Sequence, residues 1–500
     1  MAEPLGVVAA GHPLSAQAGA DALRQGGNAV DAAIAAMVTA FSCEPLLTGL
    51  GAGGYMLVVE PAGAGGGSRG PVLLDFFIAA PGRGADITAR AELVPVSVSF
   101  GDVIQVFNIG PASVGTYGMA AGVWDASTRF GRIPLAELVA PAAKLARDGV
   151  ELNVPQAYLV EILAGIVTST PECAALFAPD GRLLGPGDML RQPELADTLE
   201  RLGAEGPAPF YTGDIAAAIV EWLAERGGIV TAPDLAGYAA VDREPIRAVY
   251  RGREVRTNPP PSAGGILIAH ALALLDARHG PPELQHVVDT MEQTQAVRTP
   301  EFLEGLDDPE FVDRFLTRRS PLGSTTHVSV LDREGWACSV TCSNGSCSGV
   351  VVPGTGIHLN NMLGEQDLNP LGFHRHPPGR RMPSMMSPTA VLREGAPELV
   401  LGSAGSNRIR SAILQTIIRV VDDGLEAGDA VRAPRVHFED GVVYAEPGVD
   451  TAPLERTGRA IARFRELNLF FGGVQAAARD EQGRFSGGGD PRRGGAAIVV

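Results

Sequence analysis

The chain has one segment that decides its fold, Ser324-Thr325-Thr326-His327-Val328-Ser329-Val330-Leu331-Asp332, which is followed by Ala337-Cys338-Ser339-Val340-Thr341-Cys342-Ser343. In both runs apolar and polar residues alternate, which is the period of a β-strand, and a turn with a glycine separates them. The pattern predicts a β-hairpin whose return strand carries Cys338, Val340 and Cys342 on one face.

Two threonines open this hairpin deep inside the chain. A threonine hydroxyl is a weak nucleophile, and one way to activate it is to make it the first residue of a chain, so that its own α-amine acts as general base. Thr325 reaches that state only if the peptide bond before it is cut. On the hairpin alone, a threonine-rich strand without chemistry is the simpler interpretation.

Composition and charge exclude several classes of function. The chain has 500 residues, of which 45% are hydrophobic, as in a globular protein with a large core. Its net charge of −17, without a basic stripe, argues against a nucleic-acid partner. The first residues do not read as a signal peptide, and no apolar run is long enough to span a bilayer. We therefore expect no membrane partner and a cytoplasmic location.

The five cysteines are odd in number and form no CxxC pair, which favours reduced thiols. Cys338, Cys342 and Cys347 lie near His327 and His358 in sequence, so zinc has to be considered. The spacing matches no usual zinc pattern. We expect neither a metal nor a cofactor.

Two glycine motifs need a structural context. Residues 15–25 and 29–43 are predicted helices, the second capped by Asn28 and apolar on nearly all sides, hence buried. The GxGxxG match at 49–54 follows a helix and precedes a strand, the reverse of a dinucleotide site. The GxSxG match at 66–70 lies in a low-complexity run and is better explained as a hairpin loop.

Further along, residues 250–255 are predicted to form one short strand, and residues 280–324 an exposed linker. The strand at 398–401 leads through Gly402-Ser403-Ala404-Gly405-Ser406-Asn407 into a helix over 408–421. A glycine-rich turn at a helix N-terminus offers backbone N–H groups to an anion or a developing oxyanion. An ordinary strand-to-helix turn explains the residues equally well.

The chain resembles the γ-glutamyltranspeptidase family nearly from end to end. The segments that carry the resemblance are Gly26 to Ala33, Gly51 to Leu57, Lys144 to Gly149, Phe210 to Gly213, Pro259 to Gly265, Thr325-Thr326-His327, Leu359-Asn360-Asn361, Met386 to Thr389 and Asp490-Pro491-Arg492. So many ordered matches are more specific than any single motif.

The resemblance implies an α+β fold, the four-layer αββα sandwich of the N-terminal nucleophile (Ntn) hydrolases. The precursor would cut itself at Ser324-Thr325 into a large segment, 1–324, and a small one, 325–500, which stay associated in one core. Thr325 would be the nucleophile and Ser343 a second hydroxyl bonded to it. Gly405 and Ser406 would form the oxyanion turn.

The substrate pocket departs from the family pattern. Phe77 stands where the family has an arginine for the glutamyl α-carboxylate, and of two tandem serines only Ser384 remains, beside Met385. Glu365 keeps the spacing of an acidic residue that holds the α-amine, and Asn360 and Asn361 belong to the same motif. A carboxylate without its bidentate arginine is poorly paired, unless Arg83 replaces it.

We therefore expect an autoprocessed threonine hydrolase or acyltransferase that acts on a small-molecule amide, with an acyl group less polar than glutamyl. One alternative is a biosynthetic homologue of secondary metabolism that cleaves a C–C bond with the same threonine. Another is a non-catalytic scaffold. The sequence leaves the oligomeric state, including a homo-oligomer, open.

Overall fold

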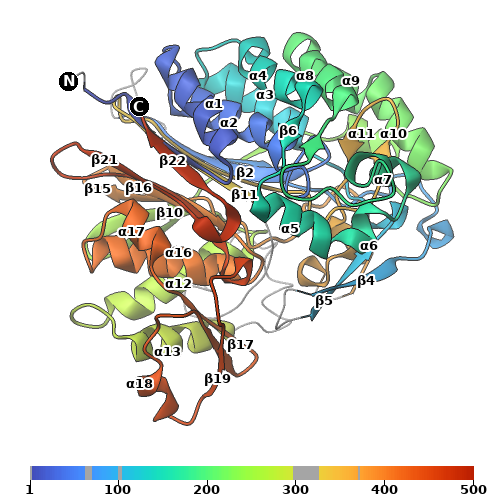
Figure 1. Ribbon diagram of the computed structural model, residues 1–500. Helices are drawn as coiled ribbons and strands as arrows, with labels where there is room; N and C mark the ends of the chain where they lie inside the picture. The colour runs from blue at the N-terminus through green and yellow to red at the C-terminus, as the bar shows by residue number, and fades with distance from the viewer. Residues whose placement is uncertain (1–2, 62–69, 100–103, 297–325, 370–371) are drawn as a thin grey trace.

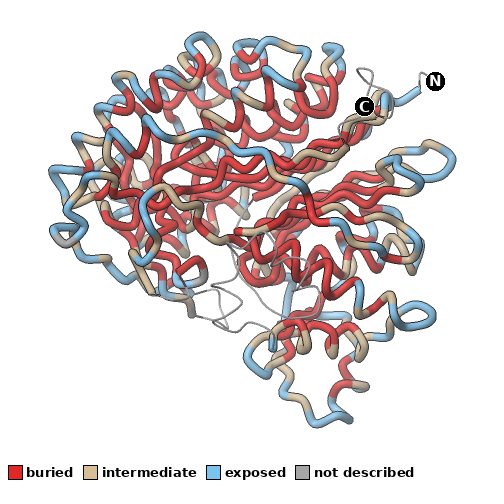
Figure 2. Tube along the Cα trace, turned by 180° about the vertical axis from the view of Figure 1, so that it is seen from behind, coloured by how far each residue is buried: buried red, intermediate tan, exposed pale blue. Residues whose placement is uncertain are grey.

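The computed structural model describes residues 3–61, 70–99, 104–296, 326–369 and 372–500. Ser324 and Thr325, and most of the GxSxG match at 66–70, lie outside these residues. The described parts form four layers, with helices above, two sheets in the middle and helices below (Figure 1). The central strands of both sheets are buried, whereas the strands at the sheet edges are partly exposed (Figure 2). The predicted α+β class and αββα sandwich are confirmed.

The predicted hairpin forms the centre of the first sheet. Its strands are β11 (Thr326–Asp332) and β12 (Ala337–Ser343), and every residue in both is buried. The sheet has seven strands in the order β22-β1-β11-β12-β2-β3-β8. The other strands are β1 (Gly6–Ala10), β2 (Gly53–Val59), β3 (Val72–Phe76), β8 (Val241–Arg243) and β22 (Ala496–Val499).

The second sheet has six strands in the order β21-β20-β16-β15-β10-β9. Their bounds are β9 (Ile246–Tyr250), β10 (Arg253–Thr257), β15 (Thr389–Arg393), β16 (Ala396–Ala404), β20 (Gly473–Arg479) and β21 (Phe485–Gly489). Each of the two sheets therefore takes strands from both sides of the Ser324–Thr325 bond.

Helices cover the outer face of each sheet. The first sheet carries α1 (Pro13–Arg24), α2 (Ala29–Cys43), α3 (Met119–Phe130), α4 (Leu135–Asp148) and α8 (Pro193–Glu205). The second carries α12 (Ala263–Asp276), α16 (Arg408–Val421) and α17 (Ala427–Arg432). All fifteen residues of α2 are buried, and Asn28 and Asp31 form a capping box at its start. The predicted buried helix and its cap are confirmed.

The remaining described elements lie around these layers. They are β4 (Val94–Ser99), β5 (Ile104–Ile109), β6 (Val150–Glu151), α5 (Val154–Ile162), α6 (Ala164–Val167), α7 (Pro171–Phe177), β7 (Met189–Leu190), α9 (Ala208–Tyr211), α10 (Asp214–Ala224), α11 (Ala232–Ala236), α13 (Leu284–Gln295), β13 (Val351–Val352), β14 (Ile357–His358), β17 (Val436–Glu439), β18 (Val442–Ala445), α18 (Ala452–Glu455) and β19 (Ala460–Arg463). Short 3-10 turns include η6 (Leu469–Phe471) and η7 (Pro491–Arg493).

A polar seam joins the two sheets at His327. The imidazole contacts Thr341 Oγ1 at 2.7 Å and Ser329 Oγ at 2.8 Å. Ser329 donates to the carbonyl of Gln475 on β20, and Ser339 to that of Leu401 on β16. Burial lowers the pKa of His327 to about 3, so the ring is neutral and works as a hydrogen-bonding bridge.

Two local predictions were wrong. Residues 250–255 are not one strand, because Arg251 and Gly252 have φ of +51° and +75° and turn β9 back into β10. Part of the predicted linker at 280–324 is helix α13, which buries Val287, Val288 and Met291 against α12. The apolar residues of α13 are too few for a clear period, and packing decides the helix instead.

Candidate active site

The start of β11 meets the end of α2, and Thr325 itself lies outside the described residues. The next residue, Thr326, is 4% exposed and pairs with Cys342 across the hairpin. Its hydroxyl lies against the carboxyl of Glu44, which is 1% exposed. A Cβ at Gly11 would lie 2.4 Å from Glu44 Oε1 and 3.0 Å from Thr326 Oγ1, so only glycine leaves space for this contact.

Glu44 is held in an unfavourable electrostatic position. It is the C-cap of α2, where the helix dipole disfavours negative charge, and its Oε1 has no hydrogen-bond partner among the described residues. Burial raises its pKa to about 7, although the charge of Arg493 and the hydroxyl of Thr326 act in the opposite direction. A buried carboxyl with a raised pKa, in contact with the residue that follows the predicted nucleophile, is a feature typical of functional sites.

Replacing Glu44 with Gln should remove a pH-dependent loss of folding stability. The folded pKa of about 7 lies above the ordinary 4.5, so the folded state holds the proton more tightly and loses stability as pH rises from 4.5 to 7. The loss is about 3 kcal/mol for the native chain and absent in E44Q. Urea unfolding at pH 5 and pH 8 measures it: the gain in unfolding free energy of E44Q over the native chain should be larger at pH 8. An equal difference at both pH values would contradict the assignment.

The end of β12 carries a second polar cluster. Ser343 is 1% exposed, and its Oγ accepts a hydrogen bond from the N–H of Gly345 at 2.9 Å. The N–H of Ser346 donates to Glu365 Oε1 at 2.8 Å, and Asn361 Nδ2 donates to Ser346 Oγ at 2.7 Å. The structure thus brings together three of the predicted site residues, Ser343, Asn361 and Glu365.

The turn between β16 and α16 contains two consecutive residues with positive φ. Gly405 and Ser406 have φ of +122° and +57°, and their carbonyls accept from the N–H groups of Arg408 and Ile409, which starts the helix. A positive φ is rare for serine, so the surrounding structure holds this turn in place. A Cβ on Gly405 would lie 2.6 Å from Gly472 Cα and 3.7 Å from Arg493 Nη2.

A cavity of about 60 Å³ lies between the Ser343 cluster and the arginines near this turn. Its polar lining consists of Ser343, Gly345, Ser346, Glu365, Gln105, Arg408 and Arg493. The rest of the wall is apolar and comes from Leu46, Leu47, Phe107, Leu159, Ile162, Leu163 and Leu469. The cavity is therefore mainly apolar, with two guanidinium groups in its wall.

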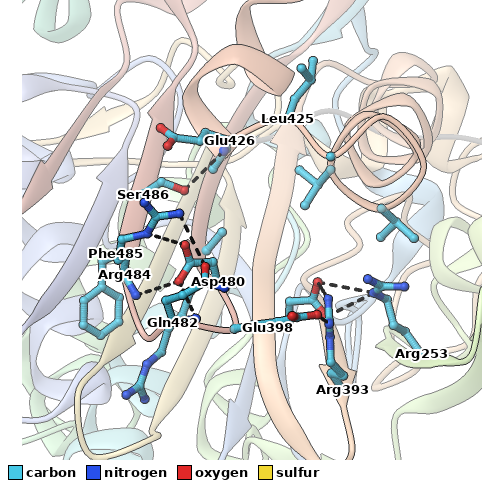
Figure 3. A pocket seen from close by; sticks show the side chains of 17 residues that line it. Arg253, Arg393, Glu398, Leu425, Glu426, Asp480, Gln482, Arg484, Phe485 and Ser486 are labelled. Atoms are coloured by element: carbon cyan, nitrogen blue, oxygen red, sulfur yellow. Dashed lines mark hydrogen bonds and ion pairs between the residues drawn. The ribbon is translucent and has the colours of Figure 1, made fainter.

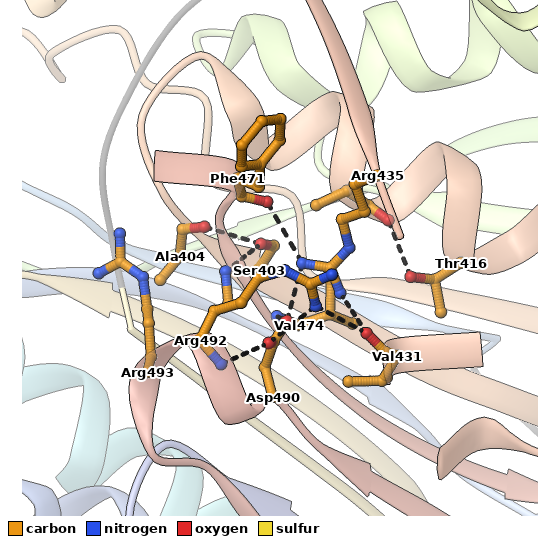
Figure 4. A network of polar contacts seen from close by, with 12 residues as sticks. Ser403, Ala404, Thr416, Val431, Arg435, Phe471, Val474, Asp490, Arg492 and Arg493 are labelled. Carbon is orange, nitrogen blue, oxygen red and sulfur yellow. Dashed lines mark hydrogen bonds and ion pairs between the residues drawn. The ribbon is translucent and has the colours of Figure 1, made fainter. Parts of the chain in front are cut away.

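A buried ion cluster supports this wall (Figure 4). Asp490 bonds Arg435 at 2.7 Å and Arg492 at 3.2 Å, and Arg492 also pairs with Glu446. Asp490 Oδ2 further accepts from the N–H of Val474 at 2.8 Å, which fixes the start of β20 next to Gly472. The cluster thus holds the segment that contacts Gly405 and the turn η7 that carries Arg493.

Replacing Asp490 with Asn should cost about 3–5 kcal/mol of unfolding free energy, because it leaves the charge of Arg435 buried without its partner. Asp480 provides the matched control, since its pair with Arg484 is exposed, with side chains 35% and 74% accessible. D480N should change stability by less than about 1 kcal/mol. Chemical denaturation of both variants compares the two losses. Equal small losses would show that the buried cluster is not needed for stability.

Other predicted substrate residues lie in the core. Phe77 is fully buried and stacks on Tyr55 with ring centroids 5.4 Å apart. Met385 packs in the second core with α12, and Ser384 Oγ accepts from the N–H of Met386 at 3.0 Å. Asn360 Nδ2 donates to the carbonyls of Gly51 and Gly115, and its Oδ1 accepts from the N–H of Gly115. None of these four lines the cavity described above, and their roles toward a substrate stay predictions.

Arg83, considered as a replacement for the missing arginine, donates to the carbonyl of Pro233 at 3.3 Å and does not line the cavity. The sequence did not single out Glu44, Arg408 or Arg493. Two features of the sequence could have indicated two of them. Arg408 is a cation in the first turn of a helix, and Glu44 is an anion at the end of an apolar helix; the helix dipole disfavours each of these charges at its position.

The described residues contain no group of three His, Cys, Asp or Glu side chains that could hold a metal ion. The five cysteines are all free and buried. No helix within the described ranges has both the length and the apolar character needed to cross a membrane.

Comparison with known proteins places this architecture in a class. The crystal structure of a cephalosporin acylase from Bacillus halodurans matches with a TM-score of 0.81 and 26% identity, covering 99% of this chain and 96% of that one. The fold is that of an N-terminal nucleophile hydrolase.

Sequence comparison then gives the family. The model of the gamma-glutamyltranspeptidase family matches residues 15–500, and the chain belongs to that family. A glutathione hydrolase proenzyme of Bacillus subtilis (strain 168) is 30% identical, over 99% of this chain and 91% of the relative. The acylase ACY 1 proenzyme of Pseudomonas sp. (strain SE83) is 31% identical, over 99% and 93%. The predicted family is confirmed, and its members are hydrolases and transferases.

Proposed function

We propose that this chain is a threonine amidase that cuts itself at Ser324-Thr325 and then hydrolyses an amide whose acyl group is less polar than γ-glutamyl. The observation that carries the substrate class is the cavity beside Ser343, with its mainly aliphatic wall. The processing step is supported by relatives that are named proenzymes.

The chemistry follows from the residues around the start of β11. The α-amine of Thr325, with an ordinary pKa near 8, takes the proton of its own hydroxyl, which attacks the amide carbonyl. Backbone N–H groups of Gly405 and Ser406 stabilise the oxyanion, and each such donor contributes about 3 kcal/mol. The leaving amine departs with the proton, and water hydrolyses the ester on Thr325. Ser343 positions the hydroxyl.

The two segments, 1–324 and 325–500, would remain together after cleavage. In the first sheet β11 pairs with β1 on one side and β12 with β2 on the other, so this hairpin of the small segment lies between strands of the large one. In the second sheet β15 pairs with β10. Separating the segments would expose both cores to water.

A panel of p-nitroanilides tests the substrate class. We expect γ-glutamyl-p-nitroanilide to be hydrolysed more slowly than anilides of short acyl groups that lack the α-amine. The reason is that Phe77 takes the place of the arginine expected to bind the glutamyl α-carboxylate. Rapid turnover of the γ-glutamyl compound with transfer to a dipeptide would overturn this part. An intact chain that hydrolyses none of the anilides would favour the non-catalytic scaffold.

A further inference from the structure

A row of polar contacts joins helix α16 to strand β17. The row is formed by the N-cap residue Asn407 and by Ser411 and Gln415, which are spaced four residues apart and therefore lie on one face of the helix. Gln415 Nε2 donates to the carbonyl of Val436 at 2.9 Å, and its Oε1 accepts from the N–H of Val436 at 3.0 Å. Ser411 Oγ lies 2.8 Å from His437 Nδ1. These contacts fix the N-terminal half of α16 against the strand.

The first contact of the row lies directly beside the turn at Gly405 and Ser406. Asn407 holds the N-cap position of α16, where an asparagine side chain usually bonds the N–H groups of its own helix. Among the described residues it makes no such bond, and its Nδ2 donates to Glu439 on β17 instead. The residue that joins the turn to the helix is thus anchored on another element.

Glu439 is an ionised carboxylate. Burial acts to raise its pKa, but His437 and the charges of Arg408 and Arg410 act in the opposite direction and lower the pKa to about 2. Burial lowers the pKa of His437 to about 4, so its ring is neutral at pH 7. An ionised carboxylate only accepts hydrogen bonds, so His437 Nε2 donates to Glu439 Oε2 at 3.3 Å and Nδ1 accepts from Ser411. The dipole of α16 also favours a negative charge at its N-terminus.

A series of serine, histidine and glutamate side chains can also form a catalytic triad. Here Ser411 and His437 are only 4% and 1% exposed, and Ser411 belongs to the buried face of α16. A nucleophile has to reach its substrate, and this serine is enclosed by the protein. The series therefore acts as a support for the helix.

The turn and the first turn of α16 form one unit. The carbonyls of Gly405 and Ser406 accept from the N–H groups of Arg408 and Ile409 at 3.0 and 3.1 Å. A shift at the start of the helix is therefore passed to the turn. A displacement of about 1 Å can cost about 100-fold in rate when it misplaces a catalytic donor.

We propose that Glu439, held by His437, is a positioning residue for the oxyanion turn and acts through Asn407. This inference rests on the proposed amidase function, in which the turn stabilises the oxyanion. Glu439 itself would touch neither the substrate nor the nucleophile.

Glu398 offers a matched control at the opposite end of β16. It lines a groove of about 510 Å³, where it pairs with Arg253 at 3.1 Å and Arg393 at 2.7 Å (Figure 3). Its side chain is 14% exposed, and that of Glu439 is 19% exposed. Each carboxylate thus faces two arginines in a similar environment. Glu398 stands near the start of β16, whereas Gly405 follows its end.

Steady-state kinetics on the best anilide tests the catalytic part. E439A should lower kcat about 10- to 100-fold with a smaller change in KM, because the donors of the turn move away from the oxyanion. E398A should keep the native kcat. N407A removes the same contact from the helix side and leaves Glu439 with its arginines, so it tests the contact with less disturbance of the fold and should also lower kcat.

The double variant E439A/N407A shows whether the two residues act together. It should be no slower than the slower of the two single variants, because both substitutions break one contact. A native kcat in both single variants, or losses that multiply in the double variant, would overturn the proposal.

Hydrogen exchange, which needs no substrate, separates this inference from the amidase function. In E439A and N407A, peptides that span the turn and the first turn of α16 should exchange at least about tenfold faster than in the native chain, and the last turns of α16 should be unchanged. E398A should leave the turn unchanged. Faster exchange in a protein that hydrolyses no anilide would keep the support at Glu439 and reject only the amidase. Hydrolysis of the anilides with unchanged exchange in both variants would reject the support alone.

Discussion

Replacing Thr325 with Ala is expected to leave a single uncut chain of 500 residues whose amidase activity falls below about a thousandth of that of the native protein. The variant lacks the hydroxyl that cleaves the preceding bond, and without cleavage there is no free α-amine to act as base. The fold should persist, because the paired and buried strand starts at Thr326. A denaturing gel and an anilide assay measure both effects.

Thr325→Ser is the matched control, since it keeps a hydroxyl and, once cut, an α-amine. It should still be processed, more slowly than the native chain, and retain measurable activity. Processing that survives in T325A would refute the assignment of the nucleophile. A T325S chain that behaves like T325A would show that the hydroxyl is not what matters.

Replacing Gly405 with Ala should lower kcat about 10²- to 10³-fold, the range for losing one oxyanion donor. The backbone has φ of +122°, and the new Cβ would lie 2.6 Å from Gly472 Cα and 3.2 Å from Gly472 N. Both atoms belong to the backbone that the Asp490 cluster holds, so the turn has to move. Steady-state kinetics on the best anilide measures the loss.

Gly441 offers a control for backbone strain alone. It has φ of +80°, and a Cβ there would meet nothing within 4 Å. G441A should cost about 1 kcal/mol of stability and leave kcat unchanged. If G405A kept the native kcat, the turn at Gly405 and Ser406 would not be the oxyanion site.

The hairpin, the buried helix α2 and its Asn28 cap could be predicted from sequence, because each depends on a local pattern of two to four residues. The turn at Arg251-Gly252 and helix α13 could not. In the first case a positive φ at arginine is required, and in the second a short amphipathic stretch folds through its contact with α12.

The site was harder to predict than the fold. Family motifs pointed to Ser343, Glu365 and the Gly405 turn, which the structure places around or beside one cavity. Glu44 and Arg493 meet Thr326 and Gly405 only through long-range packing, and no local period connects residues so far apart in sequence. The burial of these two charged side chains becomes visible only once the layers are assembled.

The central claim is that Thr325 becomes the first residue of the small segment and carries the acyl group. The most direct measurement is the intact mass of the denatured protein, combined with N-terminal sequencing. It is made on the protein alone and on protein that has been mixed with an anilide substrate and then rapidly quenched. The account predicts two fragments, 1–324 and 325–500, and an added acyl mass on Thr325 of the smaller one. A single intact chain, or an acyl group on any other residue, would contradict it.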